Sequence, residues 1–275
     1  MSSRRIGKWF LCLVFALAGC GSPRPASPPL SPAATQLITR TGTYYADQYR
    51  LDSAEAARVD ACMAAHGYPA RAPATPLSAV SRDEEWRPDL PERRQHGYGL
   101  NARGVDSTGS EPPGYDAALF GPPQARYAIT LRSGREFSFP TEGCLAQARS
   151  ALYGNPVEAA TVTFFPQDLY ATLYHQVQAD PAYDRVMRAW SACLGSRGYR
   201  YASPAQAKQQ LVAEHANRER EISVAMADAE CATQVRLPAT VEQLLATYAV
   251  RQPADVRAEL DRVAGVRDAA LRQAG

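Results

Sequence analysis

The chain has 275 residues, a formal net charge of +2 and 45% hydrophobic residues. This length allows one large domain or two small ones. The near-neutral charge argues against nucleic acid as a partner, because a nucleic-acid-binding protein requires a strongly basic face. The mean hydropathy of −0.34 excludes a protein with several membrane spans.

Residues 1–19 have the pattern of an export signal peptide. Arg4, Arg5 and Lys8 form a basic start, and an uncharged apolar run follows at 9–18. This run of ten residues is about half of the ~20 that a helix needs to cross a bilayer, so we expect a cleaved signal and no stable transmembrane anchor. Removal of 1–19 takes away these three positive charges and changes the net charge from +2 to −1.

The apolar run is followed by Cys20 in the sequence Leu17-Ala18-Gly19-Cys20, which resembles the lipobox of bacterial lipoproteins. In lipoproteins with this motif the signal is cut before the cysteine, and the cysteine thiol carries a diacylglyceryl group. The resemblance implies that Cys20 is lipidated and that the membrane is a partner, because two acyl chains give stable anchoring. The alternative is an ordinary secretory signal with a chance cysteine.

Residues 20–35 are rich in proline, serine and alanine, a composition that favours extended chain and cannot build a core. We therefore expect a lipid-anchored tether. It would hold a folded domain, starting near Gln36, on the extracytoplasmic face of the cell membrane.

Four cysteines remain after the signal peptide and the expected lipidation site: Cys62, Cys144, Cys193 and Cys231. An even number of cysteines in an exported chain indicates disulfides. Metal binding would favour close pairs such as C-x-x-C, which the sequence lacks, so we expect no metal site. A zinc site built from residues distant in the sequence is the alternative.

Two short motifs alternate along the chain and indicate a degenerate internal duplication. C-[ML]-x-x-x-G-Y and C-x-x-Q-[AV]-R occur twice each, the first at 62–68 and 193–199 and the second at 144–149 and 231–236. If each copy closes on itself, the disulfides join Cys62 to Cys144 and Cys193 to Cys231. Duplicated units can also exchange partners, so other pairings stay open.

The first disulfide unit is expected at 36–156. Within it, residues 52–66 have helical periodicity, with Asp52 as the N-cap and Glu55 reaching back to it. Gly67 would end this helix, because a glycine readily adopts the left-handed conformation of a helix end. The segment 69–125 is rich in proline, glycine and charge and is expected to be a loop.

Alternating apolar residues at 127–139 around Ser133-Gly134 predict a β-hairpin, whose apolar face should pack on helices. A helix is expected from Cys144 to about Tyr153. The second disulfide unit, at 157–275, is expected to be all-helical. One helix should start at Asp180-Pro181, and a second should run from Ser203-Pro204 to about Val235. Two further helices are expected at 240–252 and 255–273. The fold class is therefore mainly α: a helical, disulfide-stapled domain with a small β-hairpin insertion.

Catalytic motifs are not evident. The sequence lacks the P-loop, dinucleotide-binding and nucleophile-elbow motifs, so we expect no cofactor. Asp83, Glu84 and Glu85, followed by Trp86, combine carboxylates with a stacking ring, as a glycan hydrolase requires. A solvated loop anchored by Trp86 is the alternative and the better supported one, because paired carboxylates on rigid elements are not evident.

Candidate ligand contacts are Trp86 and the basic, aromatic segment that contains Arg93, Arg94 and Tyr98. Such a segment can contact anionic lipid headgroups or wall polymers. The alternative is a glycine-rich turn whose Tyr98 and Leu100 pack into the core. A further binding patch, or simple packing, is expected of the tyrosines that precede the helix at 52–66: Tyr44, Tyr45 and Tyr49.

Together these motifs make the chain similar to uncharacterised secreted lipoproteins of GC-rich Gram-positive (actinobacterial) bacteria. The similarity is carried by Cys20, Cys62-Gly67-Tyr68, Tyr98-Gly99-Leu100, Trp190-Cys193-Gly198-Tyr199 and Ala227-Asp228-Cys231. It implies a secreted, lipid-anchored protein with disulfides and adds nothing about catalysis. We therefore expect a non-enzymatic protein that binds an envelope protein or wall polymer, or supports the wall. A cell-wall or glycan hydrolase with an unrecognised carboxylate site is the alternative.

Overall fold

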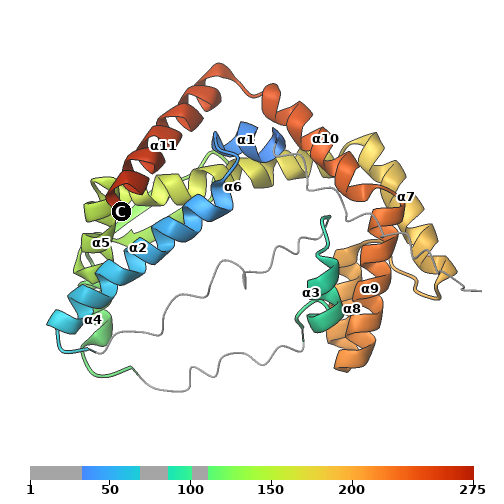
Figure 1. Cartoon of the computed structure of the whole chain (residues 1–275), viewed down its shortest axis with the longest axis horizontal. Coiled ribbons are helices and arrows are strands. Elements are labelled where there is room, and N and C mark those ends of the chain that lie inside the picture. The colour runs from blue at the N-terminus through green and yellow to red at the C-terminus, as the bar shows by residue number, and fades with distance from the viewer. Residues whose placement is uncertain (1–32, 69–85, 101–110) are drawn as a thin grey trace, which may run out of the picture.

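The computed structural model describes residues 33–68, 86–100 and 111–275 (Figure 1). The expected signal peptide, the lipidation site Cys20 and the carboxylates of Asp83, Glu84 and Glu85 lie outside the described residues. The predicted fold class is confirmed: the described chain is mainly helical, with one two-stranded antiparallel hairpin and two disulfides.

The first half of the chain holds shorter helices and the hairpin. Its elements are α1 (Ala33–Thr39), α2 (Tyr44–Ala65), α3 (Leu90–His96), α4 (Tyr115–Phe120), β1 (Arg126–Thr130), β2 (Glu136–Pro140) and α5 (Gly143–Tyr153). The second half is helical throughout its elements, which are α6 (Pro156–Gln178), α7 (Pro181–Ser196), α8 (Pro204–Ala213), α9 (Arg218–Gln234), α10 (Leu237–Val250) and α11 (Ala254–Gln273).

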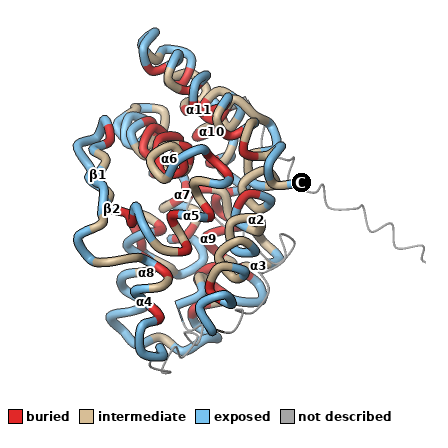
Figure 2. Tube along the Cα trace, turned by 90° about the vertical axis from the view of Figure 1, so that its left-hand side faces the viewer, coloured by how far each residue is buried: buried red, intermediate tan, exposed pale blue. Residues whose placement is uncertain are grey.

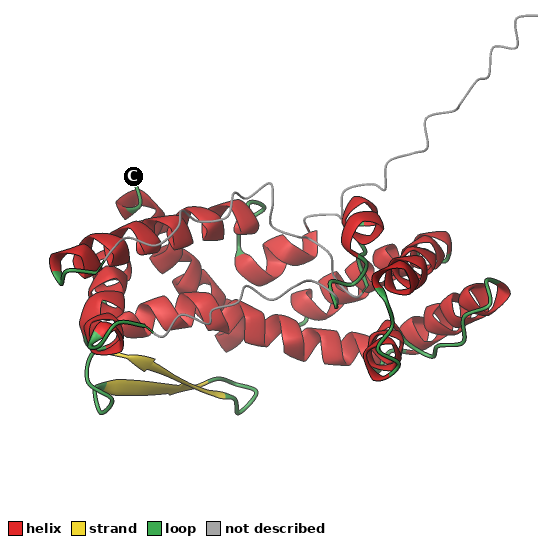
Figure 3. Ribbon diagram, turned by 90° about the horizontal axis from the view of Figure 1, so that it is seen from below, coloured by secondary structure: helices red, strands yellow, loops and turns green. Residues whose placement is uncertain are grey.

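The helices form a frame around α6. Helices α10 and α11 meet at an apex and form a triangle with α6, and α1 lies inside this triangle (Figure 1). At one end of the frame α2 and α4 pack on α5, and at the other end α3, α7 and α8 pack on α9. The hairpin lies on one side of the helices (Figure 3).

One hydrophobic core joins the two expected disulfide units. Leu51 and Leu152 from the first unit belong to the same buried cluster as Leu173 and Leu194 from the second. Figure 2 shows buried segments of many helices facing one another in the interior. Residues of the segments expected at 36–156 and 157–275 therefore share one core.

The disulfide pairing within each sequence copy is confirmed. Cys62 bonds to Cys144 and links α2 to α5, and Cys193 bonds to Cys231 and links α7 to α9. The Cys193–Cys231 bond belongs to the main core, whereas Cys144 lies in a smaller cluster with Met63. The two bonds therefore stabilise different parts of the frame.

A glutamine of the repeated motif lies against each disulfide. Oε1 of Gln147 is 3.7 Å from Sγ of Cys62, and Oε1 of Gln234 is 3.5 Å from Sγ of Cys193. The glutamine of the second motif thus lies against the cysteine of the first motif at both bridges. This likeness supports the degenerate internal duplication.

The first motif of the duplication forms a matched helix end in both copies. At the end of α2 the Gly67 N–H donates to the Ala64 carbonyl at 2.9 Å, and the Tyr68 N–H donates to the Met63 carbonyl at 3.0 Å. Gly67 has φ +85°, the left-handed conformation that such an end requires. The predicted end of this helix at Gly67 is confirmed.

The end of α7 repeats this geometry. The Gly198 N–H donates to the Gly195 carbonyl at 3.1 Å, and the Tyr199 N–H donates to the Leu194 carbonyl at 3.0 Å. Gly198 also has φ +85°. The G-Y dipeptide therefore encodes the same turn twice, directly after α2 and after α7.

Substitution of either turn glycine by alanine is expected to lower the free energy of unfolding by about 1–2 kcal/mol, because an L-residue is strained in the left-handed conformation. Neither Gly67 nor Gly198 has an atom within 4 Å of an added Cβ, so the cost comes from the backbone alone. Gly195→Ala is the control. Gly195 lies inside α7 with open space around it, so this change should raise stability by about 0.5–1 kcal/mol. Urea unfolding measures the stability of all three variants. Equal changes in stability would contradict the left-handed conformation assigned to Gly67 and Gly198.

The prediction for the start of the helix at 52–66 is wrong. Helix α2 begins at Tyr44, after Thr43, so Asp52 and Glu55 lie inside it. Asp52 accepts a hydrogen bond from Gln48 at 2.7 Å, and Glu55 forms an ion pair with Arg149 of α5 at 3.2 Å. The acidic pair that suggested a helix cap instead makes side-chain contacts along the helix.

Three other boundaries differ from prediction. Helix α1 begins at Ala33 and buries Ala34, so the folded part starts inside the tether expected at 20–35. The loop expected at 69–125 contains α3 and α4. The single helix expected to run to Val235 is divided into α8 and α9, because His215 has φ +49° and Asn217 caps a new helix through the Arg220 N–H.

The predicted hairpin is confirmed. Strand β1 pairs antiparallel with β2, and the turn contains Gly134 with φ +82°. The ring of Phe137 stacks on Phe164 of α6 with 4.2 Å between centroids, and Phe139 is buried. At the turn Asp168 of α6 accepts hydrogen bonds from the backbone N–H and the hydroxyl of Ser133. As expected, the hairpin packs on a helix.

Candidate ligand-binding cavity

A cavity of about 460 Å³ lies where α1, α2, α6 and α10 approach the segment before α3 and the hairpin turn. Its volume is in the range of about 300–1,000 Å³ typical of small-ligand sites. The lining residues are Ala34, Thr35, Ile38, Thr39, Tyr44, Tyr45, Trp86, Arg87, Arg135, Pro166, Gln167, Tyr170, Glu242 and Leu245.

Aromatic side chains from three segments supply much of the wall. Tyr44 and Tyr45 come from the first turn of α2, Tyr170 from α6, and Trp86 from the segment before α3. The rings of Tyr44 and Tyr45 pack edge to face with 5.7 Å between centroids. The indole N–H of Trp86 donates to the Tyr170 hydroxyl at 2.7 Å, which fixes both rings.

Local sequence explains why these rings converge. The short turn between α1 and α2 places Tyr44 and Tyr45 beside α1. Helix α6 contains Pro166, which also lines the cavity and has no N–H to donate to the preceding turn. The helix thus has a break in its hydrogen-bond ladder at the cavity, one turn before Tyr170.

Charged and amide groups complete the lining. Arg87 and Arg135 bring two guanidinium groups, and Glu242 brings a carboxyl. Glu242 is largely buried, and its Oε1 accepts a hydrogen bond from the Ala34 N–H at 3.1 Å. Arg87 donates to the Tyr45 hydroxyl at 3.4 Å. The cavity therefore combines aromatic surface with a net positive formal charge.

The phenol of Tyr44 stays neutral in this site. Its burial, followed by the nearby Tyr45 and Asp52, raises its pKa, and a hydrogen bond with Gln167 opposes this only in part. A neutral hydroxyl can both donate and accept a hydrogen bond. Tyr44 and the exposed carboxamide of Gln167 therefore offer a polar ligand donors and acceptors beside an aromatic wall.

The predicted ligand contacts occupy two separate places. Trp86 lines the cavity, with 4% of its surface exposed. Arg93 has no exposed surface and forms an ion pair with Asp228 at 2.5 Å, so its guanidinium is engaged inside the protein. Arg94 is exposed on α3, away from the cavity lining. The structure thus does not bring Arg93, Arg94 and Tyr98 to the cavity.

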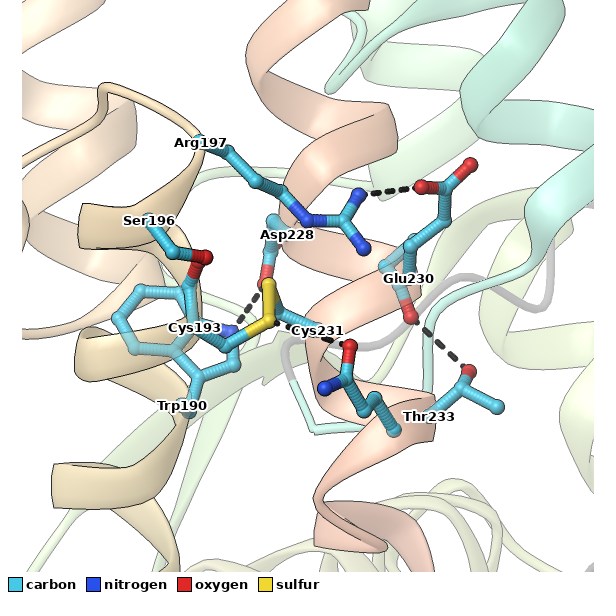
Figure 4. The surroundings of a disulfide bond; sticks show 10 residues. Trp190, Cys193, Ser196, Arg197, Asp228, Glu230, Cys231 and Thr233 are labelled. Carbon is cyan, nitrogen blue, oxygen red and sulfur yellow. Dashed lines mark hydrogen bonds and ion pairs between the residues drawn. A yellow bond between two sulfur atoms is a disulfide. The ribbon is translucent and has the colours of Figure 1, made fainter.

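Asp228 of α9 is the centre of a buried network. Its carboxylate accepts hydrogen bonds from Arg93, from the Tyr98 hydroxyl at 2.9 Å and from the Trp190 indole at 2.8 Å. Figure 4 shows the Trp190 indole directed at Asp228 beside the Cys193–Cys231 bond. This network fastens α3 and α7 to α9.

Burial and hydrogen bonding act against each other on this network. Burial raises the pKa of Asp228, and the Arg93 charge together with its three donors opposes that shift. Burial, helped by the Asp228 charge, also raises the pKa of Tyr98 far above its usual range, so this phenol is a permanent donor. The Tyr98 ring lies 5.3 Å from the Lys208 ammonium. Tyr98 is partly buried and packs against the main core, as the turn alternative expected, whereas Leu100 is 38% exposed.

The sulfurs of Cys62 and Cys144 and a ring nitrogen of His66 lie within 4.8 Å of one another. Such a group resembles a set of metal ligands. The two sulfurs are bonded to each other, however, and a disulfide sulfur lacks the thiolate charge that binds a metal. The cluster is a disulfide with a neighbouring imidazole.

Sequence reasoning did not identify Tyr170, Gln167, Arg135 or Glu242. None of them belongs to a motif, and they come from α6, the hairpin turn and α10. Tyr44 and Tyr45 were predicted as a candidate binding patch, because they are aromatic residues beside a predicted helix. Their partner Trp86 was a separate candidate, and only the tertiary fold brings the three together.

No family model, curated protein or solved structure matches the chain. Among the helices of the described residues, none is both long and apolar enough to cross a membrane. The two disulfides are typical of proteins in an oxidising, extracytoplasmic environment.

Proposed function

We propose that this protein is a membrane-anchored lipoprotein of the extracytoplasmic face that binds a ligand without chemical turnover. The observation that carries the binding role is the aromatic cavity of about 460 Å³, with Trp86 fixed by Tyr170 in its wall. The anchor is supported by the signal pattern of 1–19 and by Cys20. Its partners are the membrane, through the lipid on Cys20, and a component of the envelope.

Metabolic labelling tests the anchor. Cells grown with labelled palmitate should yield labelled protein, and Cys20→Ala should abolish the label because alanine has no thiol to acylate. The Cys62→Ala/Cys144→Ala variant is the control, since it removes cysteines but keeps Cys20. If the wild-type protein carries no label, lipidation is refuted, and the proposal that the cavity binds a ligand is unaffected.

Tryptophan fluorescence tests the binding role. Trp86 lines the cavity, while Trp190 is fully buried in the core, so a ligand should change the emission of Trp86 alone. Titration with soluble envelope extracts should shift the emission of the wild-type protein and leave Trp86→Phe unchanged. An extract-dependent shift that persists in Trp86→Phe would place binding outside the cavity.

A glycan hydrolase is the second candidate, and the position of Trp86 favours it. This ring lines the cavity, and Asp83, Glu84 and Glu85 directly precede it in the sequence. Incubation of the purified protein with peptidoglycan or glycan substrates should release no product if the protein only binds. Product release that is lost on Glu84→Gln or Glu85→Gln would overturn the non-enzymatic proposal.

A further inference from the structure

The cavity has a chemical composition that selects among ligand classes. Aromatic rings favour flat apolar faces, guanidinium groups favour carboxylates, and carboxyl and carboxamide groups favour hydroxyls or amides. We propose that the cavity binds a sugar ring that carries a carboxylate. This inference rests on the binding role proposed above and names the ligand class of the same site.

The aromatic wall fits the apolar face of a sugar ring. The ring of Tyr170, held by Trp86, and the edge-to-face pair of Tyr44 and Tyr45 belong to different helices. The C–H groups on one face of a pyranose can pack against such rings and leave the hydroxyls at its rim. A straight alkyl chain could also pack against the aromatic rings, but it would form no hydrogen bonds with the polar groups of the site.

The polar groups of the lining can exchange hydrogen bonds with a ligand. Glu242 uses Oε1 to accept the Ala34 N–H, and Gln167 lies on the same helix as Tyr170, one turn before it. Burying polar groups under an apolar ligand without replacing their hydrogen bonds costs about 1–3 kcal/mol for each group. A ligand with several hydroxyl or amide groups avoids this cost, whereas a simple aromatic acid does not.

The charge of the lining favours an anion. Arg87 and Arg135 come from different segments, and Glu242 is the one carboxyl among the lining residues. Arg87 is held near the aromatic wall, with its guanidinium carbon 5.6 Å from the Trp86 ring centroid and a hydrogen bond to Tyr45. Arg135 is exposed at the hairpin turn and lines the cavity. The two arginines together would hold a ligand carboxylate by charge-assisted hydrogen bonds.

A matched pair of probes tests the proposal. N-acetylmuramic acid differs from N-acetylglucosamine by a lactyl group that carries a carboxylate, and glucuronic acid differs from glucose by a carboxylate in place of the primary alcohol. Calorimetric titration of the purified mature protein should give a dissociation constant at least about tenfold lower for an acidic sugar than for its neutral partner, which corresponds to one charge-assisted hydrogen bond.

Arginine variants locate the selectivity. Arg87→Gln combined with Arg135→Gln should reduce the preference for the acidic sugar to about onefold, and circular dichroism should show that this variant remains folded. Arg94→Gln is the matched control, because Arg94 is an exposed arginine outside the cavity. Gln167→Ala should weaken acidic and neutral sugars alike, because its carboxamide would meet hydroxyls that both share. Selectivity that persists in the double arginine variant would overturn the assignment.

The remaining outcomes separate this inference from the proposed function. Equal affinity for acidic and neutral sugars would refute the proposal that the ligand carries a carboxylate, and the binding role would stand. Tighter binding of indole-3-acetate than of either acidic sugar would refute the sugar ring and keep the binding role. If none of these probes binds, while an envelope extract still shifts Trp86 emission, the ligand class is wrong; if the extract also fails, the cavity has no binding function.

Discussion

Replacement of Asp228 by alanine is expected to lower the free energy of unfolding by about 3–5 kcal/mol, because it leaves a buried guanidinium without its counter-charge. Arg93 has no exposed surface, so water cannot replace the lost carboxylate. The same change removes the acceptor of the Tyr98 hydroxyl and of the Trp190 indole. Urea unfolding followed by circular dichroism measures the loss.

An exposed ion pair provides the control for this prediction. Asp184 and Arg188 pair on the surface of α7, with more than half of each side chain exposed. Asp184→Ala should therefore cost less than about 1 kcal/mol. A second variant, Arg93→Met with Asp228→Leu, removes both charges and should recover part of the stability lost in Asp228→Ala. Equal losses for Asp228→Ala and Asp184→Ala would contradict a structural role for the buried network.

Removal of the Cys193–Cys231 bond by a double change to alanine is expected to lower the free energy of unfolding by about 4 kcal/mol. The bond closes a loop with a sequence separation of 38, and its loss increases the conformational entropy of the unfolded chain. Because Cys231 lies in the main core, exchange of amide hydrogens should increase in α7 and α9 and across the helices that pack on them. Urea unfolding and hydrogen exchange measure the two effects.

The other bond serves as the comparison. Cys62→Ala with Cys144→Ala opens a loop with a separation of 82 and should also cost about 4 kcal/mol. Its cysteines belong to the smaller cluster around Met63, so faster exchange should be confined to α2, α4 and α5. Peptide mapping without reductant should recover both bonds in the wild-type chain, and a peptide that joins Cys62 to Cys193 would contradict the structure.

Elements defined by local chemistry could be predicted from the sequence. The G-Y helix ends depend on one glycine each, and the hairpin depends on alternation around Ser133-Gly134. The repeated motifs favoured the cysteine pairing that the structure shows, and they left an exchange of partners open. In each case the signal lies within a few residues, where backbone conformation and side-chain spacing decide the outcome.

Boundaries controlled by tertiary contacts could not be predicted in this way. Asp52 and Glu55 have the spacing of a helix cap, yet Glu55 is held by Arg149 from another helix. The division between α8 and α9 requires His215 to adopt a positive φ, which is uncommon for any residue other than glycine. At such positions tertiary contacts determine the backbone conformation, and local propensity does not.

The candidate site was predictable only in pieces. Trp86, Tyr44 and Tyr45 were candidates because they are aromatic, and they lie in two segments of the chain. The groups that give the cavity its charge and hydrogen-bonding capacity, Arg135 and Glu242 among them, carry no local signal. Arg93 was predicted as a ligand contact, but the packing of α3 on α9 buries it completely.

The position of Lys208 beside Tyr98 makes the protein simple to label close to α3. Within residues 20–275, Lys208 is the single lysine. Its ammonium lies 5.3 Å from the Tyr98 ring, at the junction of α8 with the turn after α3. An amine-reactive dye would label this lysine and the α-amino group of the chain. The dye on Lys208 would report the docking of α3 without an engineered cysteine that could exchange with the disulfides.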